Sequence, residues 1–369
     1  SRTVTDPNSM TTVSEYNYRN WLVKVTDPAS HSVQYAYNRA GEMIKQTDAK
    51  GKDTTFAFDA LGRRISTTDR LSYTTTFAWN ALGLQASLTD AHSQTTSYEY
   101  DAFQRLYRTT WPDHTPGTSP GNQNYGITQT EYDSLNRVLR TTDQLGDTIT
   151  HSYDAAGRLL TKAYRTRVNS PSGTISDSDT FTNNANSQML TAICGRYNNT
   201  VTMTYDAASR KATEALTIGG QTYTCTTQYD AAGRVSKLIY PNASEVSRTY
   251  TARGQLHTIK LGSTTIDTRT YDNGGRLTGS SYNNGISETR TYNPDSTVAT
   301  IQYSSSAIGN FSYTWDANHN KTSETISGVM SGYGFTATYD DDDRLLTWDR
   351  ADSNLEQSWN LSAVGNWNS

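Results

Sequence analysis

The chain has 369 residues, of which 34% are hydrophobic, and its 36 acidic and 32 basic residues leave a net charge of −4. Leu, Ile, Val and Phe together number 56, about 15% of the chain, which is well below the share found in ordinary soluble domains. The small net charge argues against disorder, and 25 Tyr, 7 Trp and 7 Phe favour a β-rich chain. The shortage of aliphatic residues therefore excludes one large solid core, but it does not exclude folding.

Several other classes of protein are excluded by simple patterns. The longest apolar runs are three residues, such as Trp21–Val23, so no segment is expected to span a bilayer. No basic stripe indicates a nucleic-acid surface. Neither end resembles a signal peptide, and Ser1 stands where a Met would begin a complete chain, so we expect a piece of a longer protein.

Two cysteines, Cys194 and Cys225, are too few for a disulfide scaffold or a zinc site. They allow either one bridge or two free thiols. We favour free thiols, because no sequence feature brings the two residues together.

An internal repeat runs along the chain. Its anchor is an aromatic residue followed by Asp or Asn, and eight of the 14 gaps between 15 anchors are 21 residues long. The anchors are Tyr16, Tyr37, Phe58, Trp79, Tyr100, Tyr132, Tyr153, Asn183 (a degenerate copy), Tyr205, Tyr229, Tyr250, Tyr271, Tyr292, Trp315 and Tyr339, with a partial copy near Trp359. A constant register over more than 300 residues indicates a repeat architecture.

Each repeat position has a structural interpretation. The Asp or Asn after the anchor can accept a hydrogen bond from the backbone two residues later and so begin a turn. Gly, or Asn in two copies, stands four residues after the anchor in nine repeats, where positive φ would reverse the chain. Arg follows in eight copies, and we expect it to pair with Asp between stacked hairpins.

The segments that flank this turn are expected to be strands. Aromatic residues recur at period two before the turn, as in Tyr35 with Tyr37 and Phe56 with Phe58, which places both rings on one face. Residues 64–68 and 138–142 are expected strands after the turn, and an Asp 11 residues past the anchor predicts a second turn. One repeat is therefore a β-hairpin.

About 30 such strands are too many for a flat sheet, because twisted open sheets rarely exceed ~10 strands without curling. The sequence predicts an all-β fold in which hairpins of about 21 residues form a long curled sheet, a hollow spiral or part of one. We expect a single array over residues 1–369, with insertions at 111–126 and 165–180 that form loops.

The motif Tyr-Asp-x-x-Gly-Arg, clear at Tyr153–Arg158 and Tyr229–Arg234, resembles the YD repeats of the Rhs family, which also occur in the B and C components of ABC toxin complexes and in teneurins. The resemblance implies a hollow shell that encloses a polypeptide, often a C-terminal toxin, and a secreted or cell-surface protein of bacterial origin. It further implies that the partners are an enclosed cargo or neighbouring domains of the same protein. The family's self-cleavage motif, plug and toxin domain are not expected within this stretch.

No catalytic residue, cofactor-binding residue or metal ligand is expected, and so no cofactor. The Asp/Arg pairs recur too regularly for an active site. The six histidines, which show no metal-ligand spacing, are His31, His92, His114, His151, His257 and His319. His319 occupies a Gly position, so a turn role is expected. Asp340–Asp343 is the densest acidic run; a calcium loop there is the weaker alternative to an ordinary turn, because the Gly is missing.

Two functions from different classes remain. The first is a non-catalytic shell segment that encapsulates a cargo. The alternative is an extracellular adhesion or carbohydrate-binding module whose Tyr and Trp rings contact sugars. The direction of the anchor rings distinguishes them: rings packed between hairpins favour the shell, and rings lining a groove favour binding.

Overall fold

The computed structural model describes residues 1–112, 126–165 and 175–366, and the regular structure in those ranges is β apart from one 3-10 turn, η1 (Gly328–Met330). None of the described residues forms a helix with the length and hydrophobicity needed to cross a membrane. The strands are β1 (Arg2–Thr5), β2 (Thr11–Tyr16), β3 (Leu22–Thr26), β4 (Ser32–Tyr37), β5 (Met43–Thr47), β6 (Asp53–Phe58), β7 (Arg64–Thr68), β8 (Thr74–Trp79), β9 (Gln85–Thr89), β10 (Thr95–Tyr100), β11 (Leu106–Thr110), β12 (Ile127–Tyr132), β13 (Val138–Thr142), β14 (Thr148–Tyr153), β15 (Leu159–Arg165), β16 (Ile175–Asn183), β17 (Met189–Cys194), β18 (Asn199–Tyr205), β19 (Lys211–Ile218), β20 (Gln221–Tyr229), β21 (Val235–Ile239), β22 (Glu245–Tyr250), β23 (Leu256–Leu261), β24 (Thr264–Tyr271), β25 (Leu277–Tyr282), β26 (Ser287–Tyr292), β27 (Val298–Tyr303), β28 (Phe311–Trp315), β29 (Lys321–Ile326), β30 (Phe335–Tyr339), β31 (Leu345–Arg350) and β32 (Glu356–Ser358).

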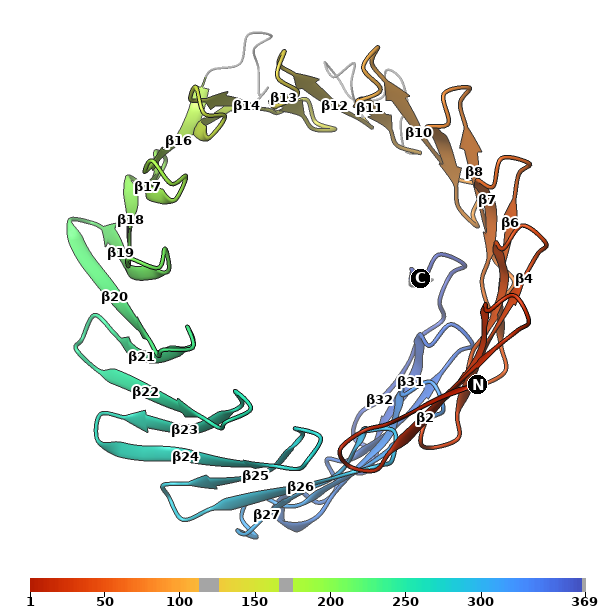
Figure 1. Ribbon diagram of the computed structural model, residues 1–369, viewed down its shortest axis with the longest axis vertical. Helices are drawn as coiled ribbons and strands as arrows, with labels where there is room; N and C mark the ends of the chain where they lie inside the picture. Colours follow the sequence, from red (N-terminus) through yellow and green to blue (C-terminus); the bar gives the residue numbers. More distant parts are fainter. Residues whose placement is uncertain (113–125, 166–174, 367–369) are drawn as a thin grey trace. The chain divides into compact units, whose positions relative to one another are not determined.

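The strands belong to one 32-stranded sheet in which strands consecutive in the chain pair antiparallel (Figure 1). The predicted all-β fold of repeated hairpins is confirmed. By packing, the chain divides into two compact units: residues 1–77, 89–93 and 249–369 form the first, and residues 78–88 and 94–248 form the second.

The strands follow from period-two alternation. In β6, Thr54, Phe56 and Phe58 are half-buried while the residues between them are exposed, as expected when alternate side chains share a face. Strands β7 and β13 have the predicted bounds, residues 64–68 and 138–142.

The repeats near the N-terminus contain two turns of one kind, whereas some later repeats return through other turns, such as the two-residue turn at Gly219 and Gly220. We call the five residues after an anchor aromatic the anchor turn. The return turn is the five residues that begin with the Asp at the end of the following strand, which is 11 positions after the anchor where one precedes it; residues 6–10 form the first such turn. In the anchor turn of residues 59–63, the amide of Gly62 donates to the carbonyl of Asp59 (3.0 Å) and the amide of Asp59 donates to the carbonyl of Arg63 (2.9 Å). Gly62 has φ +78°, and the strand register shifts by one residue at Phe58. This is a type I turn closed by a glycine bulge.

The position that reverses the chain takes several residue types. It is Gly51 (φ +82°) in one return turn, Asn136 (φ +65°) in an anchor turn, and Asp343 (φ +62°) in the acidic run. The left-handed residue predicted for nine repeats is therefore confirmed, and His319 (φ +66°) takes the turn position expected of it.

The interior is sparse. Among the residues that the structure describes, the buried hydrophobic residues are Ile127, Ile326 and Ala337. Cys194 and Cys225 are both free thiols, as predicted. Much of the two predicted insertions, residues 113–125 and 166–174, lies outside the described residues; of the rest, Arg165 ends β15 and residues 175–180 belong to β16.

Candidate functional site

Nine of the anchor rings form a hydrogen bond to the hairpin before their own. The Tyr153 hydroxyl donates to the carbonyl of Val138 (2.8 Å), and the Arg137 guanidinium lies over the Tyr153 ring, 4.5 Å from its centre. Both partners belong to the preceding repeat, so the ring packs between hairpins. The same hydroxyl-to-carbonyl bond is made by Tyr100, Tyr132, Tyr205, Tyr229, Tyr271, Tyr292 and Tyr339, and Trp315 makes it with its indole nitrogen.

We expect Tyr153→Phe to lower the free energy of unfolding by about 1 kcal/mol, because it removes one hydrogen bond to a backbone carbonyl and leaves the ring in place. Urea denaturation measures this change. The matched control is Tyr197→Phe in the same unit, where the side chain is 66% exposed and the effect should stay within about 0.5 kcal/mol. Equal losses in the two variants would contradict a structural role for the anchor hydroxyl.

The Asp of each anchor turn uses its two oxygens for different tasks. In residues 154–158, Asp154 Oδ1 accepts from the amides of Ala156 and Arg158 (both 2.9 Å), and Oδ2 accepts from Arg158 Nε (2.6 Å). The Arg158 backbone amide, opposed by partial desolvation and assisted by the Arg158 side chain, lowers the pKa of Asp154. A second guanidinium nitrogen of Arg158, Nη1, donates to the carbonyl of Asn184 in the next repeat.

The eight Asp/Arg ion pairs of the repeat motif each lie within a single anchor turn, not between stacked hairpins as expected from the sequence. The link between hairpins is the guanidinium, which donates to a carbonyl of the next turn or covers the next anchor ring, as Arg105 covers Tyr132 at 4.6 Å.

Repeats with Asn in place of Asp keep the turn and change the partner. Asn184 Oδ1 still accepts from two backbone amides, while its Nδ2 donates to Gln188 Oε1 (2.7 Å). Asn38 Nδ2 donates to a Glu42 carboxylate oxygen in the same way. The residue four positions on is thus a donor after Asp and an acceptor after these two Asn residues.

In the first unit, return turns near the N-terminus contact anchor turns near the C-terminus. The contact residues come from the return turns 6–10, 27–31, 48–52 and 69–73 and from the anchor turns 272–276, 293–297, 316–320 and 340–344. We call these eight turns the seam. At one end of the seam, Asn8 Oδ1 accepts from the Gly274 amide (2.8 Å).

Arg70 is the most connected cation of the seam. Its Nη1 lies 2.6 Å from Asp48 Oδ2 and 2.6 Å from Asp343 Oδ2, and its Nε lies 3.3 Å from Asp342 Oδ1. The side chain is 17% exposed. Burial opposes the charged form, but the bonds to Asp48 and Asp343 raise the pKa of Arg70, so the guanidinium is held as a cation.

The acidic run at residues 340–343 lies in this seam. Lys50 Nζ lies 3.0 Å from Asp343 Oδ1, and Lys52 Nζ lies 2.8 Å from Asp341 Oδ2. Burial raises the pKa of Asp343, but donors from Asn318, Lys50 and Arg70 outweigh it and bring the pKa down to about 2. The acidic run is therefore paired with basic side chains from the N-terminal part of the chain. These cations neutralise the negative charge that a bound calcium ion would neutralise in a calcium loop.

We expect Asp343 to make the stability of the first unit acid-sensitive. Its folded-state pKa of about 2 lies below the value of about 3.9 for an unfolded chain, so the unfolded state binds more protons between these values. The contribution is fully present above about pH 4 and is lost as pH falls toward 2. Asp343→Asn should flatten this part of a curve of unfolding free energy against pH; an unchanged slope would contradict the assignment.

The structure brings two of the six histidines together. His31 and His319 face each other across the seam with ring centres 6.3 Å apart, beside Asp27 and Asp295. His92, His151 and His257 lie on other turns and strands, and His114 lies outside the described residues. The sequence prediction missed this grouping, because its members come from opposite ends of the chain.

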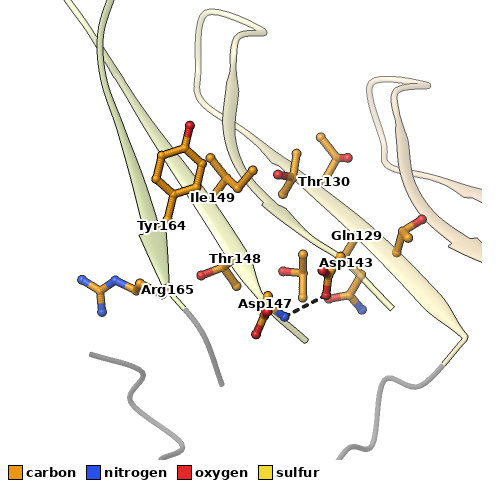
Figure 2. Close-up of a pocket in the computed structure, with 11 residues that line it drawn as sticks. Gln129, Thr130, Asp143, Asp147, Thr148, Ile149, Tyr164 and Arg165 are labelled. Carbon is orange, nitrogen blue, oxygen red and sulfur yellow. Dashed lines mark hydrogen bonds between the residues drawn. The ribbon is translucent and has the colours of Figure 1, made fainter. Parts of the chain in front are cut away.

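A shallow pocket of about 480 Å³ lies in the second unit, on strands β12 to β15 (Figure 2). Its lining includes threonines together with Ile149 and Tyr164. The Asp143 carboxylate in it accepts from the Asp147 amide (2.9 Å), as in any return turn. A hydrogen bond to Asp179, together with desolvation, raises the pKa of Tyr164 to about 12, so that phenol stays protonated at neutral pH. The lining side chains therefore belong to the face of the sheet and to the return turn at residues 143–147.

Comparison with known proteins agrees with the repeat. The model of the RHS Repeat family matches residues 16–55, 37–74, 58–93, 79–113 and 132–175. No curated protein matches the chain.

Solved structures share the fold. The chain is similar to one in the Photorhabdus luminescens Tc holotoxin pore, with a TM-score of 0.78 and 14% identity over 98% of this chain and 21% of that one. It is also similar to the crystal structure of TcdB2-TccC3, with a TM-score of 0.71 and 14% identity over 93% of this chain and 20% of that one. The chain spans about a fifth of the length of these proteins.

Hairpins joined by anchor rings, with ion pairs inside the turns, define a repeat scaffold. Every motif position that recurs is used to form a turn or to hold the next hairpin. The family model finds RHS repeats in the chain over residues 16–113 and 132–175, and the fold of the chain is the one seen in the Tc toxin structures.

Proposed function

We propose that this chain is a shell segment that encloses a polypeptide cargo, such as a toxin domain of the same full-length protein, for secretion or delivery. The observation that carries the proposal is the direction of the anchor rings: Tyr153, Tyr229 and Tyr271 pack against the preceding hairpin. Rings that pack between hairpins stabilise the sheet and are not available to stack on a ligand. The likeness to Tc toxin structures supports the same role.

The proposal places the protein outside the bacterial cell, with neighbouring domains of the full-length protein as its partners. It also makes this stretch non-enzymatic, in keeping with the Asp and Arg side chains of the repeat motif and the seam, which are paired with one another. Any enzymatic activity would then belong to the cargo.

Protease protection tests the proposal. The full-length protein that contains this chain is treated with a nonspecific protease, and the segment that follows the repeats is followed by mass spectrometry. We expect that segment to survive while the same segment expressed alone is digested. Equal digestion rates would overturn the encapsulation role.

A binding role has one observation in its favour. Several aromatic side chains at turns are exposed, among them Tyr18 (90%), Phe103 (76%) and Tyr197 (66%), and exposed rings can stack on sugars. The alternative is therefore an adhesion or carbohydrate-binding module. Selective binding on a glycan array, lost on Tyr18→Ala or Phe103→Ala, would favour it over the shell.

A further inference from the structure

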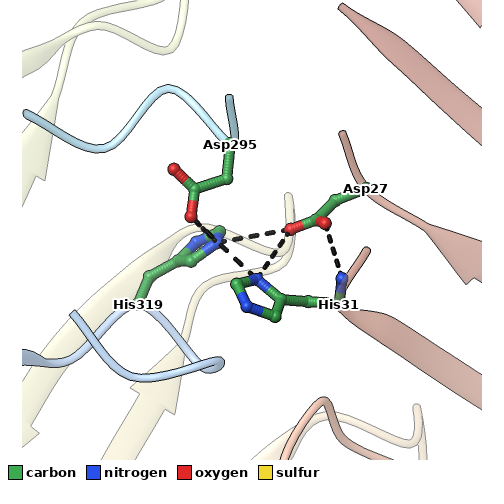
Figure 3. A group of neighbouring side chains, drawn as sticks. All are labelled: Asp27, His31, Asp295 and His319. Atoms are coloured by element: carbon green, nitrogen blue, oxygen red, sulfur yellow. Dashed lines mark hydrogen bonds and ion pairs between the residues drawn. The ribbon is translucent and has the colours of Figure 1, made fainter. Parts of the chain in front are cut away.

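Four side chains of the seam form a compact group of nitrogen and oxygen ligands (Figure 3). We call this group the His–Asp cluster; its members are Asp27, His31, Asp295 and His319. Each offers one donor atom, and the four donor atoms lie within 4.8 Å of one another. All four residues belong to the first unit.

The distances between donor atoms are close to those of a tetrahedral zinc site. His31 Nδ1 lies 3.2 Å from Asp27 Oδ2 and 4.0 Å from Asp295 Oδ2. His319 Nε2 lies 3.7 Å and 3.6 Å from the same two oxygens. Ligands about 2.05 Å from a tetrahedral metal are about 3.4 Å apart, so these four nitrogen–oxygen distances are within about 0.6 Å of the tetrahedral value, and the two remaining pairs, at most 4.8 Å apart, would have to close by no more than about 1.4 Å.

The carboxylates are oriented before any ion arrives. Asp27 Oδ1 accepts from the amides of Ala29 and His31 (2.9 and 2.8 Å), and Asp295 Oδ1 accepts from the amide and hydroxyl of Thr297 (3.0 and 2.7 Å). Each turn thus holds one oxygen and leaves Oδ2 directed at the histidines. Such outer bonds are what fixes ligands in metal centres.

The donor set also selects the kind of ion. Two imidazole nitrogens suit zinc and its neighbours among the transition metals, whereas calcium takes six to eight oxygens. Two carboxylates balance the charge of a divalent cation. The Asp295 side chain is 5% exposed and the His319 side chain is 48% exposed. The site is therefore buried on the Asp295 side and open to solvent on the His319 side, where an ion can enter.

We propose that the His–Asp cluster binds one zinc ion and so fastens the N-terminal hairpins of the first unit to its C-terminal hairpins. This goes beyond the shell role and does not depend on the nature of the cargo. Because the ion would bind the folded unit and not the unfolded chain, it would stabilise the seam in proportion to the logarithm of the zinc concentration.

The test uses the whole 369-residue chain, stripped of metal with a chelator and titrated with Zn²⁺ by calorimetry. We expect one ion per chain, a rise in Tm with zinc, and, with Co²⁺ as the probe, the visible absorption bands of a tetrahedral site. His319→Asn should weaken zinc binding by at least about 100-fold, since loss of an outer-shell partner alone costs about 10–100-fold.

His319→Asn also controls for folding. Asn tolerates the positive φ of this position and stands there in other anchor turns, so the turn is retained while the imidazole is lost. Asp295→Asn should weaken binding without removing the turn bonds to Oδ1. The matched control is His92→Ala, an exposed histidine in a return turn outside the cluster, which should leave zinc affinity unchanged.

Three results would overturn the proposal. One is a folded wild-type chain that takes up no zinc. Another is zinc binding that survives His319→Asn and Asp295→Asn at full affinity. The third is a loss of affinity in His92→Ala equal to the loss in His319→Asn, which would indicate nonspecific binding to surface histidines.

Discussion

Replacing Arg70 with Met should lower the free energy of unfolding of the first unit by about 2–4 kcal/mol, because it leaves carboxylates without their cation. Asp48, Asp342 and Asp343 all contact this guanidinium. Methionine fills similar space, so most of the loss should come from uncompensated charge. Urea denaturation, followed by a probe in the first unit, measures the change.

The control for this effect is an exposed ion pair in the same unit. Lys45 Nζ lies 3.0 Å from Asp53 Oδ2, and both side chains are 44% exposed, so Lys45→Met should cost less than about 1 kcal/mol. A further check is Arg70→Met combined with Asp343→Asn, which should recover part of the loss because one unpaired charge is removed. A loss for Arg70→Met no larger than that for Lys45→Met would show that the seam does not hold the two ends of the unit together.

Gly309→Ala should destabilise the first unit by about 3 kcal/mol, from backbone strain and overpacking together. Gly309 has φ +89°, and a Cβ placed on it would lie 2.2 Å from the backbone carbonyl oxygen of Ser327. A carbonyl cannot move aside as a flexible side chain can. The change is measured as a shift in the urea midpoint with the m-value held as a check on cooperativity.

Gly51→Ala separates strain from collision. Gly51 has a similar φ of +82°, and its Cβ direction is open for 4 Å, so Ala there should cost only about 1–2 kcal/mol. Gly51→Asn should cost less, since Asn accepts this backbone conformation. Equal losses in the free energy of unfolding for Gly309→Ala and Gly51→Ala would mean that the close approach to the Ser327 carbonyl does not contribute to the destabilisation.

The features that were predictable from the sequence are those set by local chemistry. A carboxylate followed by a left-handed residue forms a turn wherever it occurs, so the hairpins, the strand at residues 138–142 and the turn role of His319 all followed from the repeat. The seam did not, because Arg70 and Asp342 are joined only by the way distant hairpins meet. The His–Asp cluster was missed for the same reason, as His31 and His319 belong to opposite ends of the chain.

One signal was present in the sequence and overlooked. The eight repeats with Arg five positions after the anchor all have Asp at the first position, as in Asp154 with Arg158, and no repeat with Asn there has that Arg. Taken together, the two positions would have placed both side chains in one turn, not in neighbouring hairpins.

In turns such as those of Asp154 and Asn184, Oδ1 accepts from the backbone and the second side-chain atom, Oδ2 or Nδ2, contacts the side chain four residues later. This difference affects how the sequences of such repeats can diverge. A single substitution disturbs the pair. Asp154→Asn places the Nδ2 donor against the Arg158 donor, and Arg158→Gln removes the cation that pairs with Asp154. The double exchange to Asn and Gln restores the complementarity seen in Asn184 and Gln188. Only a few combinations of residues are therefore compatible at these two positions, and related chains should change both residues together. Neutral drift at these turns is thus expected to proceed by compensated steps.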